Sequence, residues 1–236
     1  MRDETHGESE SNRHAAPISD AREAREERKS HALTLAPGDQ LMGLSVFQLD
    51  QSHQQPLVQI AETTAQERRS ADGIHGYAIF RSMDTGDVAV LTQWEHRSVY
   101  DQAPQTLLKP IEQDLYQITL LHHSTGQTTS CLVPGDGLFH FINVFHLAPG
   151  RSKDFLDYFR RSIPLVSASM GFISTTVLIS LDEQYAANIG QFITRQAFQA
   201  IFRNPRILLT FSEPLRRRII RGFPRFRYYD LVAASS

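Results

Sequence analysis

Hydrophobic and polar residues along the chain predict one series of elements twice: strand, helix, strand, strand, helix, strand. Apolar and β-branched residues that alternate with polar ones predict the strands, and spacings of three and four predict the helices. The expected strands are 41–50, 73–82, 88–94 and 115–123 in the first half, and 139–147, 171–180, 184–192 and 227–234 in the second. The expected helices are 55–69, a short one near 98–103, 152–168, 195–202 and 207–220. In the 152–168 helix, a single buried stripe is expected from Phe155, Tyr158, Phe159 and Ile163.

The two halves are related by a constant offset of 98 residues. Residues 41–94 align with 139–192 without a gap, and Val46–Phe47 recur as Val144–Phe145. A match of this length without an insertion implies the same order of strands and helices in both copies. The chain is therefore expected to be two versions of one module.

We predict an α+β protein made of two tandem ferredoxin-like domains, residues 39–132 and 137–236, joined by the linker 133–137. A split βαβ unit forms four antiparallel strands with two helices on one face and leaves the other face bare. Two such sheets close against each other in a dimeric α+β barrel, so a tandem chain can form an intramolecular pseudo-dimer. Residues 1–38 contain few large apolar residues, and we expect this segment to be disordered.

Composition narrows the function only slightly. A net charge of −2 gives no support for a nucleic-acid partner. No apolar run approaches the roughly 20 residues that a membrane span requires, and the polar start is unlike a secretory signal. We therefore expect a cytoplasmic protein with no membrane partner. Cys131 is the only cysteine, which excludes a disulfide within the chain and favours a structural thiol.

Arginines are concentrated near the end of the chain. Residues 195–227 include nine arginines but a single acid, Glu213. The run Arg216, Arg217 and Arg218 has two interpretations. It is either a solvated helical face or a site for the phosphate or carboxylate of a cofactor or anionic substrate, which the guanidinium fork suits.

Three segments of the second half carry a resemblance to a known family. They are FINVFHLAPGR at 141–151, SIPLVSASMGFIS at 162–174, and NIGQF at 188–192 followed by RQAF. These segments resemble the antibiotic biosynthesis monooxygenase superfamily, which includes anthrone-oxidising quinone-forming oxygenases, haem-degrading enzymes and isomerases. Tandem members are similar to aromatic polyketide tailoring oxygenases, among them enzymes that open a ring of an angucycline quinone. The resemblance implies an oxygenase that uses O2 on a polycyclic aromatic polyketide in antibiotic biosynthesis.

The resemblance also implies site residues. In the family, the polar groups are an asparagine on the first strand and an Asn/Trp pair, four residues apart, on the third. The second half keeps Asn143 and Asn188 but has Phe192 at the tryptophan position, whereas the first half keeps only the tryptophan, Trp94. We predict catalytic roles for Asn143, Asn188 and Trp94.

Strand alternation surrounds these amides with aromatic residues, because every second side chain shares a face. Gly190 is included because a strand glycine often marks the close approach of a ligand or another backbone. His140 and His146 alternate with Asn143, so we expect both on the opposite face, in a packing role more than as a base. His146 is nevertheless kept among the binding residues. The predicted substrate-binding set is Phe139, Phe141, Phe145, Phe192, Gly190 and His146.

Two interpretations of the asparagines stay open. An unpaired buried amide costs about 1–3 kcal/mol, so Asn143 and Asn188 either satisfy each other or a backbone group, or they meet a ligand. In the second case they point into an aromatic-walled cavity and hold the oxygens of a flat phenolic compound.

The expected reaction uses no metal, no haem and no tightly bound cofactor. A phenol, anthrone or hydroquinone loses a proton and passes an electron to O2, and the resulting peroxide collapses to a quinone or a cleaved ring. The asparagine amides and the Trp94 indole would stabilise the oxyanion. Haem-degrading relatives carry a histidine about ten residues beyond the tryptophan, where this chain has Pro104 and Phe202.

Other assignments stay open beside this one. Reduced flavin (FADH2 or FMNH2), supplied by a separate flavin reductase, would bind through Arg216, Arg217 and Arg218. A non-catalytic binding or accessory protein for an aromatic metabolite, and a cofactor-free isomerase or cyclase, are the alternative functions. A homodimer beyond the internal pairing is also left open.

Overall fold

The computed structural model describes residues 31–69, 73–102, 110–224 and 226–236. The strands are β1 Leu33–Leu35, β2 Leu41–Phe47, β3 Ile74–Ser82, β4 Val88–Trp94, β5 Glu112–His123, β6 Ser130–Leu132, β7 Phe139–His146, β8 Phe172–Ser180, β9 Tyr185–Phe192 and β10 Arg227–Ser235. The helices are α2 Gln51–Arg69, α3 Arg97–Gln102, α4 Ser152–Ser167, α5 Arg195–Ile201 and α6 Pro205–Arg216. Within the described residues, none of these helices combines the length and the hydropathy that crossing a membrane requires.

The offset of 98 residues reappears in the elements themselves. Strands β2 and β7 begin at Leu41 and Phe139, β3 and β8 at Ile74 and Phe172, and α3 and α5 at Arg97 and Arg195. The copies diverge after this point, because the second module adds α6 before its last strand. The α+β fold built from two ferredoxin-like units is confirmed.

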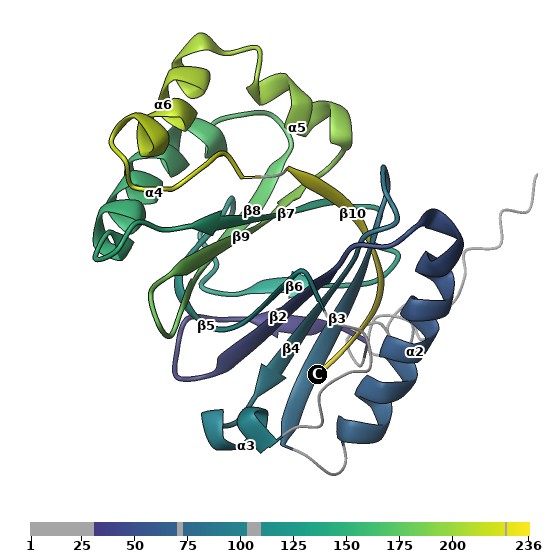
Figure 1. The fold of residues 1–236 in the computed structure, drawn as a ribbon. Coiled ribbons are helices and arrows are strands. Elements are labelled where there is room, and N and C mark those ends of the chain that lie inside the picture. The colour runs from purple at the N-terminus through teal and green to yellow at the C-terminus, as the bar shows by residue number, and fades with distance from the viewer. Residues whose placement is uncertain (1–30, 70–72, 103–109, 225) are drawn as a thin grey trace, which may run out of the picture.

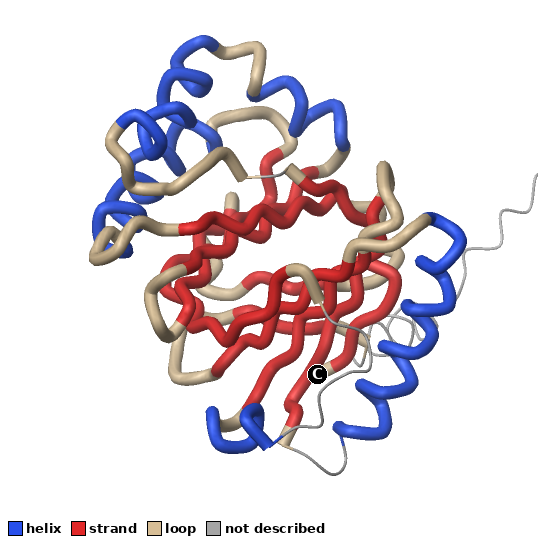
Figure 2. Tube along the Cα trace, viewed as in Figure 1, coloured by secondary structure: helices blue, strands red, loops and turns tan. Residues whose placement is uncertain are grey.

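Eight strands form one closed barrel in the order β10-β3-β4-β2-β5-β8-β9-β7, and every neighbouring pair is antiparallel. The last strand of each module joins the two halves. Strand β5 pairs with β2 of its own module and with β8 of the other, and β10 pairs with β7 and with β3. The two sheets therefore share hydrogen-bonded edges, and Figure 2 shows them as a continuous ring of strands with helices outside.

The barrel interior is an apolar core that also holds a short ribbon. Strands β1 and β6 pair with each other, and Leu33, Leu35 and Leu132 are fully buried in the same cluster as the inward-facing barrel residues. Our expectation of disorder through residue 38 is wrong for 33–35, because burying leucines offsets the cost of ordering three residues. Residues 1–30 lie outside the described part of the chain.

A buried ion pair joins the modules beside this core. The Arg227 guanidinium of β10 contacts both carboxylate oxygens of Glu112, at 2.8 and 3.2 Å, and Asp87 at 3.3 Å. Both acids belong to the first module, and the Arg227 and Asp87 side chains are less than a tenth exposed. The charges are therefore compensated across the seam between the halves.

The helices form separate outer layers. Helix α2 packs on β3 and β4, whereas α4, α5 and α6 gather beyond β7, β8 and β9 on the other side of the barrel (Figure 1). The predicted α4 stripe is confirmed, since Phe155, Tyr158, Phe159 and Ile163 are buried. These three helices do not pack directly onto the sheet everywhere, and the space that they leave is the candidate site.

Candidate active site

A cavity of about 250 Å³ lies between the outer face of β7–β9 and the helices α4, α5 and α6. Its wall is dominated by phenylalanine, because ten of the 14 phenylalanines of the chain line it. They are Phe141, Phe145, Phe159, Phe172, Phe192, Phe198, Phe202, Phe211, Phe223 and Phe226. Such a wall is suited to a flat apolar ring system, which stacks on or meets the edges of aromatic rings.

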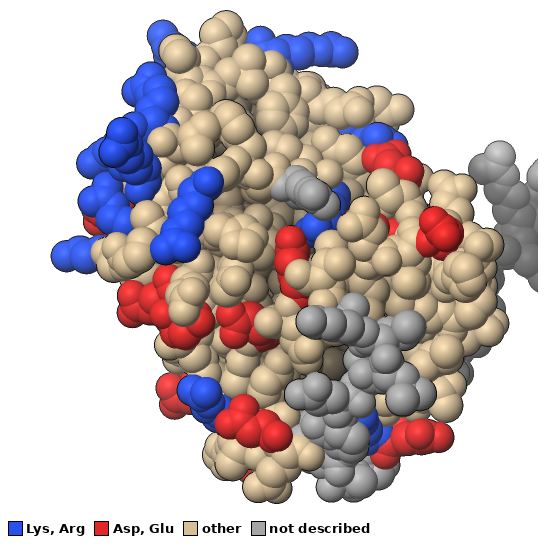
Figure 3. All heavy atoms as spheres, viewed as in Figure 1, with Lys and Arg blue, Asp and Glu red and all other residues tan. Residues whose placement is uncertain are grey.

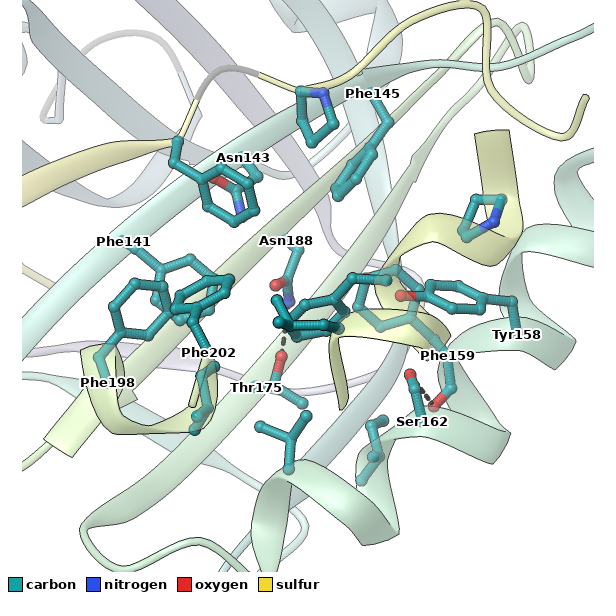
Figure 4. A pocket seen from close by; sticks show the side chains of 18 of the residues that line it. Phe141, Asn143, Phe145, Tyr158, Phe159, Ser162, Thr175, Asn188, Phe198 and Phe202 are labelled. Atoms are coloured by element: carbon teal, nitrogen blue, oxygen red, sulfur yellow. Dashed lines mark hydrogen bonds between the residues drawn. The ribbon is translucent and has the colours of Figure 1, made fainter. Parts of the chain in front are cut away.

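The sheet contributes three polar side chains to the cavity. Asn143 of β7 and Asn188 of β9 are direct partners in the antiparallel register, and Thr175 of β8 lies beside Asn188. Asn188 Nδ2 donates to Thr175 Oγ1 and, at 3.3 Å, to the carbonyl oxygen of Thr176. Asn188 is therefore held in one orientation by its own sheet, as Figure 4 shows.

Asn143 is in a different state. It is only 3% exposed, and its Oδ1 has no hydrogen-bond partner among the described residues. The two asparagines do not satisfy each other through this atom, although they are neighbours. Hydrogen bonds within the protein satisfy the Asn188 amide group, as the first interpretation of the asparagines expects. They leave the Asn143 side-chain carbonyl oxygen without a partner among the described residues.

The helices contribute hydroxyl groups to the cavity that the sequence did not lead us to predict as part of the site. Tyr158 and Ser162 of α4 and Ser212 of α6 line the cavity. Tyr158 was recognised only as part of the buried stripe. The available signal was Ser162, which falls four residues later on that stripe, where an apolar residue would pack equally well.

The predicted phenylalanines and Gly190 differ in where they lie relative to the cavity. Phe141, Phe145 and Phe192 lie on the cavity wall, whereas Phe139 is not part of the wall and packs with Phe198 in the same aromatic cluster. Gly190 also serves a different purpose from the one predicted. A Cβ at this position would lie 2.2 Å from the Phe141 ring, so a neighbouring side chain fills the space that we assigned to a ligand.

Trp94 is not brought to this cavity. It lies in the first module, where its indole nitrogen donates to Thr92 Oγ1 at 2.7 Å and its ring meets Tyr100 edge-on at 5.4 Å. It is buried with Ile74 and Leu115. The three predicted catalytic residues therefore do not converge, and Trp94 is separated from the asparagines because it belongs to the other copy.

The remaining predicted residues lie outside the wall as well. His146 is exposed at the end of β7 with its ring against Tyr185, at a centroid distance of 4.8 Å. Arg216, Arg217 and Arg218 are exposed, in the region where Figure 3 shows basic side chains gathered over α4 and α6. None of these four is among the described residues that line the cavity.

The cavity wall that the structure describes contains no ionisable acid, histidine, lysine or arginine. Its single phenol, Tyr158, has a pKa raised well above the ordinary value, because burial disfavours the phenolate. The nearest buried histidine on β7, His140, faces the barrel interior instead. Burial lowers the pKa of His140 to about 4, so its imidazole is neutral at physiological pH. The described wall therefore offers a ligand neutral hydrogen-bonding groups.

Comparison with known proteins shows what this chain resembles in sequence and in fold. No family model matches the chain. Tetracenomycin-F1 monooxygenase from Streptomyces glaucescens is 29% identical over 75 residues, which are 31% of this chain and 67% of the relative. A crystal structure of an anthrone oxidase-like protein superimposes with a TM-score of 0.71 at 17% identity and covers 86% of this chain and 96% of that one. The chain is thus similar in sequence to a monooxygenase over about a third of its length and shares its fold with the anthrone oxidase-like protein.

The coverage of the anthrone oxidase-like structure is too large for a single module, so the match in fold extends over both halves of this chain. The same fold also occurs in a major regulator of staphylococcal pathogenesis, with a TM-score of 0.53 at 12% identity and coverage of 82% and 100%. Because the barrel serves such different proteins, function has to be argued from the cavity.

Proposed function

We propose that the second module is an oxygenase that uses O2 to oxidise a hydroxylated polycyclic aromatic compound of the polyketide type, giving a quinone or a cleaved ring. One observation carries the proposal: the Asn143 carbonyl oxygen is buried without a partner in a wall made mostly of phenylalanine. A buried acceptor of this kind is stabilised by a ligand that brings an O–H group. The names of the relatives, a monooxygenase and an anthrone oxidase-like protein, agree with this substrate class.

Binding follows from the geometry of the wall. Asn143 lies in the middle of β7 with Phe141 and Phe145 two residues away on either side, so the polar contact is flanked by aromatic surface at both ends. The ring system would stack between the phenylalanines and donate a hydroxyl proton to Asn143 Oδ1. The compound best suited to this wall carries its reacting oxygen on an inner ring of a fused system.

The reaction begins when the bound phenol or enol loses its proton to bulk solvent, because the described wall holds no ionisable base, and the peroxide formed later regains a proton from solvent when it collapses. The Asn143 amide can donate to the developing oxyanion, and the Asn188 amide can do so by exchanging its 3.3 Å contact with the Thr176 carbonyl oxygen for the ligand. The apolar wall excludes water, which strengthens these contacts. The electron-rich ring then passes an electron to O2, and recombination forms a peroxide on the ring carbon. For an anthrone, a ring CH2 group and O2 become a carbonyl and one water, which carries both hydrogens.

The test is oxygen consumption by the purified full chain with anthrone as the probe. Asn143→Leu and Asn188→Leu keep the approximate side-chain volume and remove the amides, so we expect each to lower kcat about 100-fold, the usual cost of losing an oxyanion donor. Ser45→Ala is the matched control, since Ser45 occupies the position of Asn143 in the first module and should leave the rate unchanged.

The alternatives give different outcomes in the same assay. Tight binding of anthrone without oxygen uptake indicates a carrier, and a rearranged product without oxygen uptake indicates an isomerase or cyclase. Turnover that requires added reduced FMN and a flavin reductase indicates the flavin route, for which the exposed Arg216–Arg218 run is the expected contact. Wild-type rates in both asparagine variants would contradict the proposal.

A further inference from the structure

Helix α4 carries two hydroxyl groups on its buried face, where packing alone calls for apolar side chains. Tyr158 is 4% exposed and Ser162 is 3% exposed, and both lie among Phe155, Phe159 and Ile163 on the stripe. The two residues are one helical turn apart, so their side chains are neighbours on the helix surface. This placement buries two polar groups at the edge of the cavity.

The hydrogen bonds of the pair determine what it can offer a ligand. Ser162 Oγ donates to the carbonyl oxygen of Phe159 at 3.1 Å, so the serine oxygen is left as an acceptor. Ser162 also lies close enough to the Tyr158 hydroxyl to oppose the effect of burial on the phenol pKa. Both hydroxyl oxygens, of Tyr158 and of Ser162, therefore keep acceptor capacity for a ligand.

The pair occurs only in the module that has the cavity just described. At the offset of 98 residues, the first module has Ile60 in place of Tyr158 and Thr64 in place of Ser162. Ile60 is 59% exposed on α2, so the equivalent position there points to solvent. In Figure 4, by contrast, the Tyr158 side chain extends toward the cavity from the helix, opposite the sheet that carries Asn188.

We propose that Tyr158 and Ser162 form a second recognition site, which selects substrates bearing a hydroxyl group on an outer ring, away from the oxygen that meets Asn143. The inference rests on the proposed function for the identity of the ring system. Tyr158 is a specificity-determining residue in this scheme and does not touch the reacting atoms. The favoured substrate is therefore a fused aromatic compound with two oxygen functions, one bound by Asn143 on the sheet and one bound by Tyr158 and Ser162 on α4.

The test compares anthrone with a set of monohydroxyanthrones that differ in the ring position of the hydroxyl. Binding is measured without oxygen, so that it is independent of turnover. The wild type should bind one positional isomer about tenfold more tightly than anthrone, which corresponds to about 1.4 kcal/mol for a buried hydrogen bond. Tyr158→Phe and Ser162→Ala should reduce this preference to about twofold or less.

Tyr185→Phe is the matched control, because it removes the same hydroxyl at the start of β9, outside the cavity wall. Thermal unfolding of each variant checks that the fold is intact, and the conservative Ser162→Thr should keep most of the preference. A preference that persists in both Tyr158→Phe and Ser162→Ala, or a wild type that binds all isomers as it binds anthrone, overturns the inference. Selective binding without oxygen uptake would instead leave this inference standing and refute the oxygenase.

Discussion

At the scale of single residues, the two modules solve the same packing problem in opposite ways. In the second module, Phe141 on β7 faces Gly190 on β9, and the phenylalanine ring occupies the space above the glycine. In the first, the glycine is on the other strand, since Gly43 on β2 faces Thr92 on β4. The exchange puts a large ring on the cavity wall in one copy only. The sequence shows both glycines, but which neighbour fills the gap depends on side-chain rotamers that alternation does not specify.

Gly190→Ala tests this packing. The added methyl group would displace the Phe141 ring, and we expect a loss of about 1–3 kcal/mol in unfolding free energy, typical of overpacking, together with weaker ligand binding. In a double-mutant cycle with Phe141→Ala, the combined cost should be smaller than the sum of the single costs. Urea denaturation measures the unfolding free energies, and ligand titration measures the binding.

Gly222→Ala is the control for that experiment, because a Cβ there meets nothing within 4 Å. It should change stability by less than about 0.5 kcal/mol. Strict additivity of the Gly190 and Phe141 substitutions would show that the ring does not depend on the glycine.

At the scale of elements, the repeat predicted the strands and helices that the copies share, because both follow one hydrophobic pattern. It could not predict β1 and β6, which are three residues each and too short for any periodicity. Their pairing joins distant parts of the chain, since Thr34 faces Cys131, 97 positions further on. Cys131 itself is exposed on this ribbon, with its thiol 3.8 Å from the Thr34 hydroxyl. For the cavity, the sequence pointed to the strand residues but not to the helix hydroxyls, because their role depends on a gap between layers.

The ribbon is expected to be a necessary part of the barrel core. Leu33→Ala would leave a cavity among fully buried residues and should cost about 2–5 kcal/mol in unfolding free energy. Thr34→Ala, one residue along the same strand but exposed, should cost less than about 0.5 kcal/mol. Chemical denaturation of the two variants distinguishes a packed ribbon from a loosely attached one, for which both costs would be small.

At the scale of the whole molecule, the two halves are held together by exchanged strands and by two sets of ion pairs, one buried and one exposed. Arg227 is enclosed with Glu112 and Asp87, whereas Arg195 and Asp84 make a bidentate pair between the modules at the surface, with both contacts at 2.9 Å. Side chains in the surface pair are 36% and 40% exposed. Solvent screens an exposed pair, whereas a buried charge that loses its partner is left uncompensated.

Arg227→Ala should therefore cost about 3–5 kcal/mol in unfolding free energy, since it leaves two carboxylates without their cation at the seam between the modules. Arg195→Ala, which breaks the exposed pair, should cost no more than about 1 kcal/mol. Differential scanning calorimetry gives both values, and equal costs for the two arginines would contradict this ranking.

The exchanged strands have a consequence for how such a protein can change over generations. In a barrel assembled from two identical chains, each substitution is introduced at two symmetry-related places at once. Here β5 and β10 are encoded separately, so a substitution in the space under the helices of one module leaves the other module unchanged. One copy is then free to specialise in ligand recognition while the other drifts toward a supporting role, and the shared ring of hydrogen bonds keeps the pair from separating.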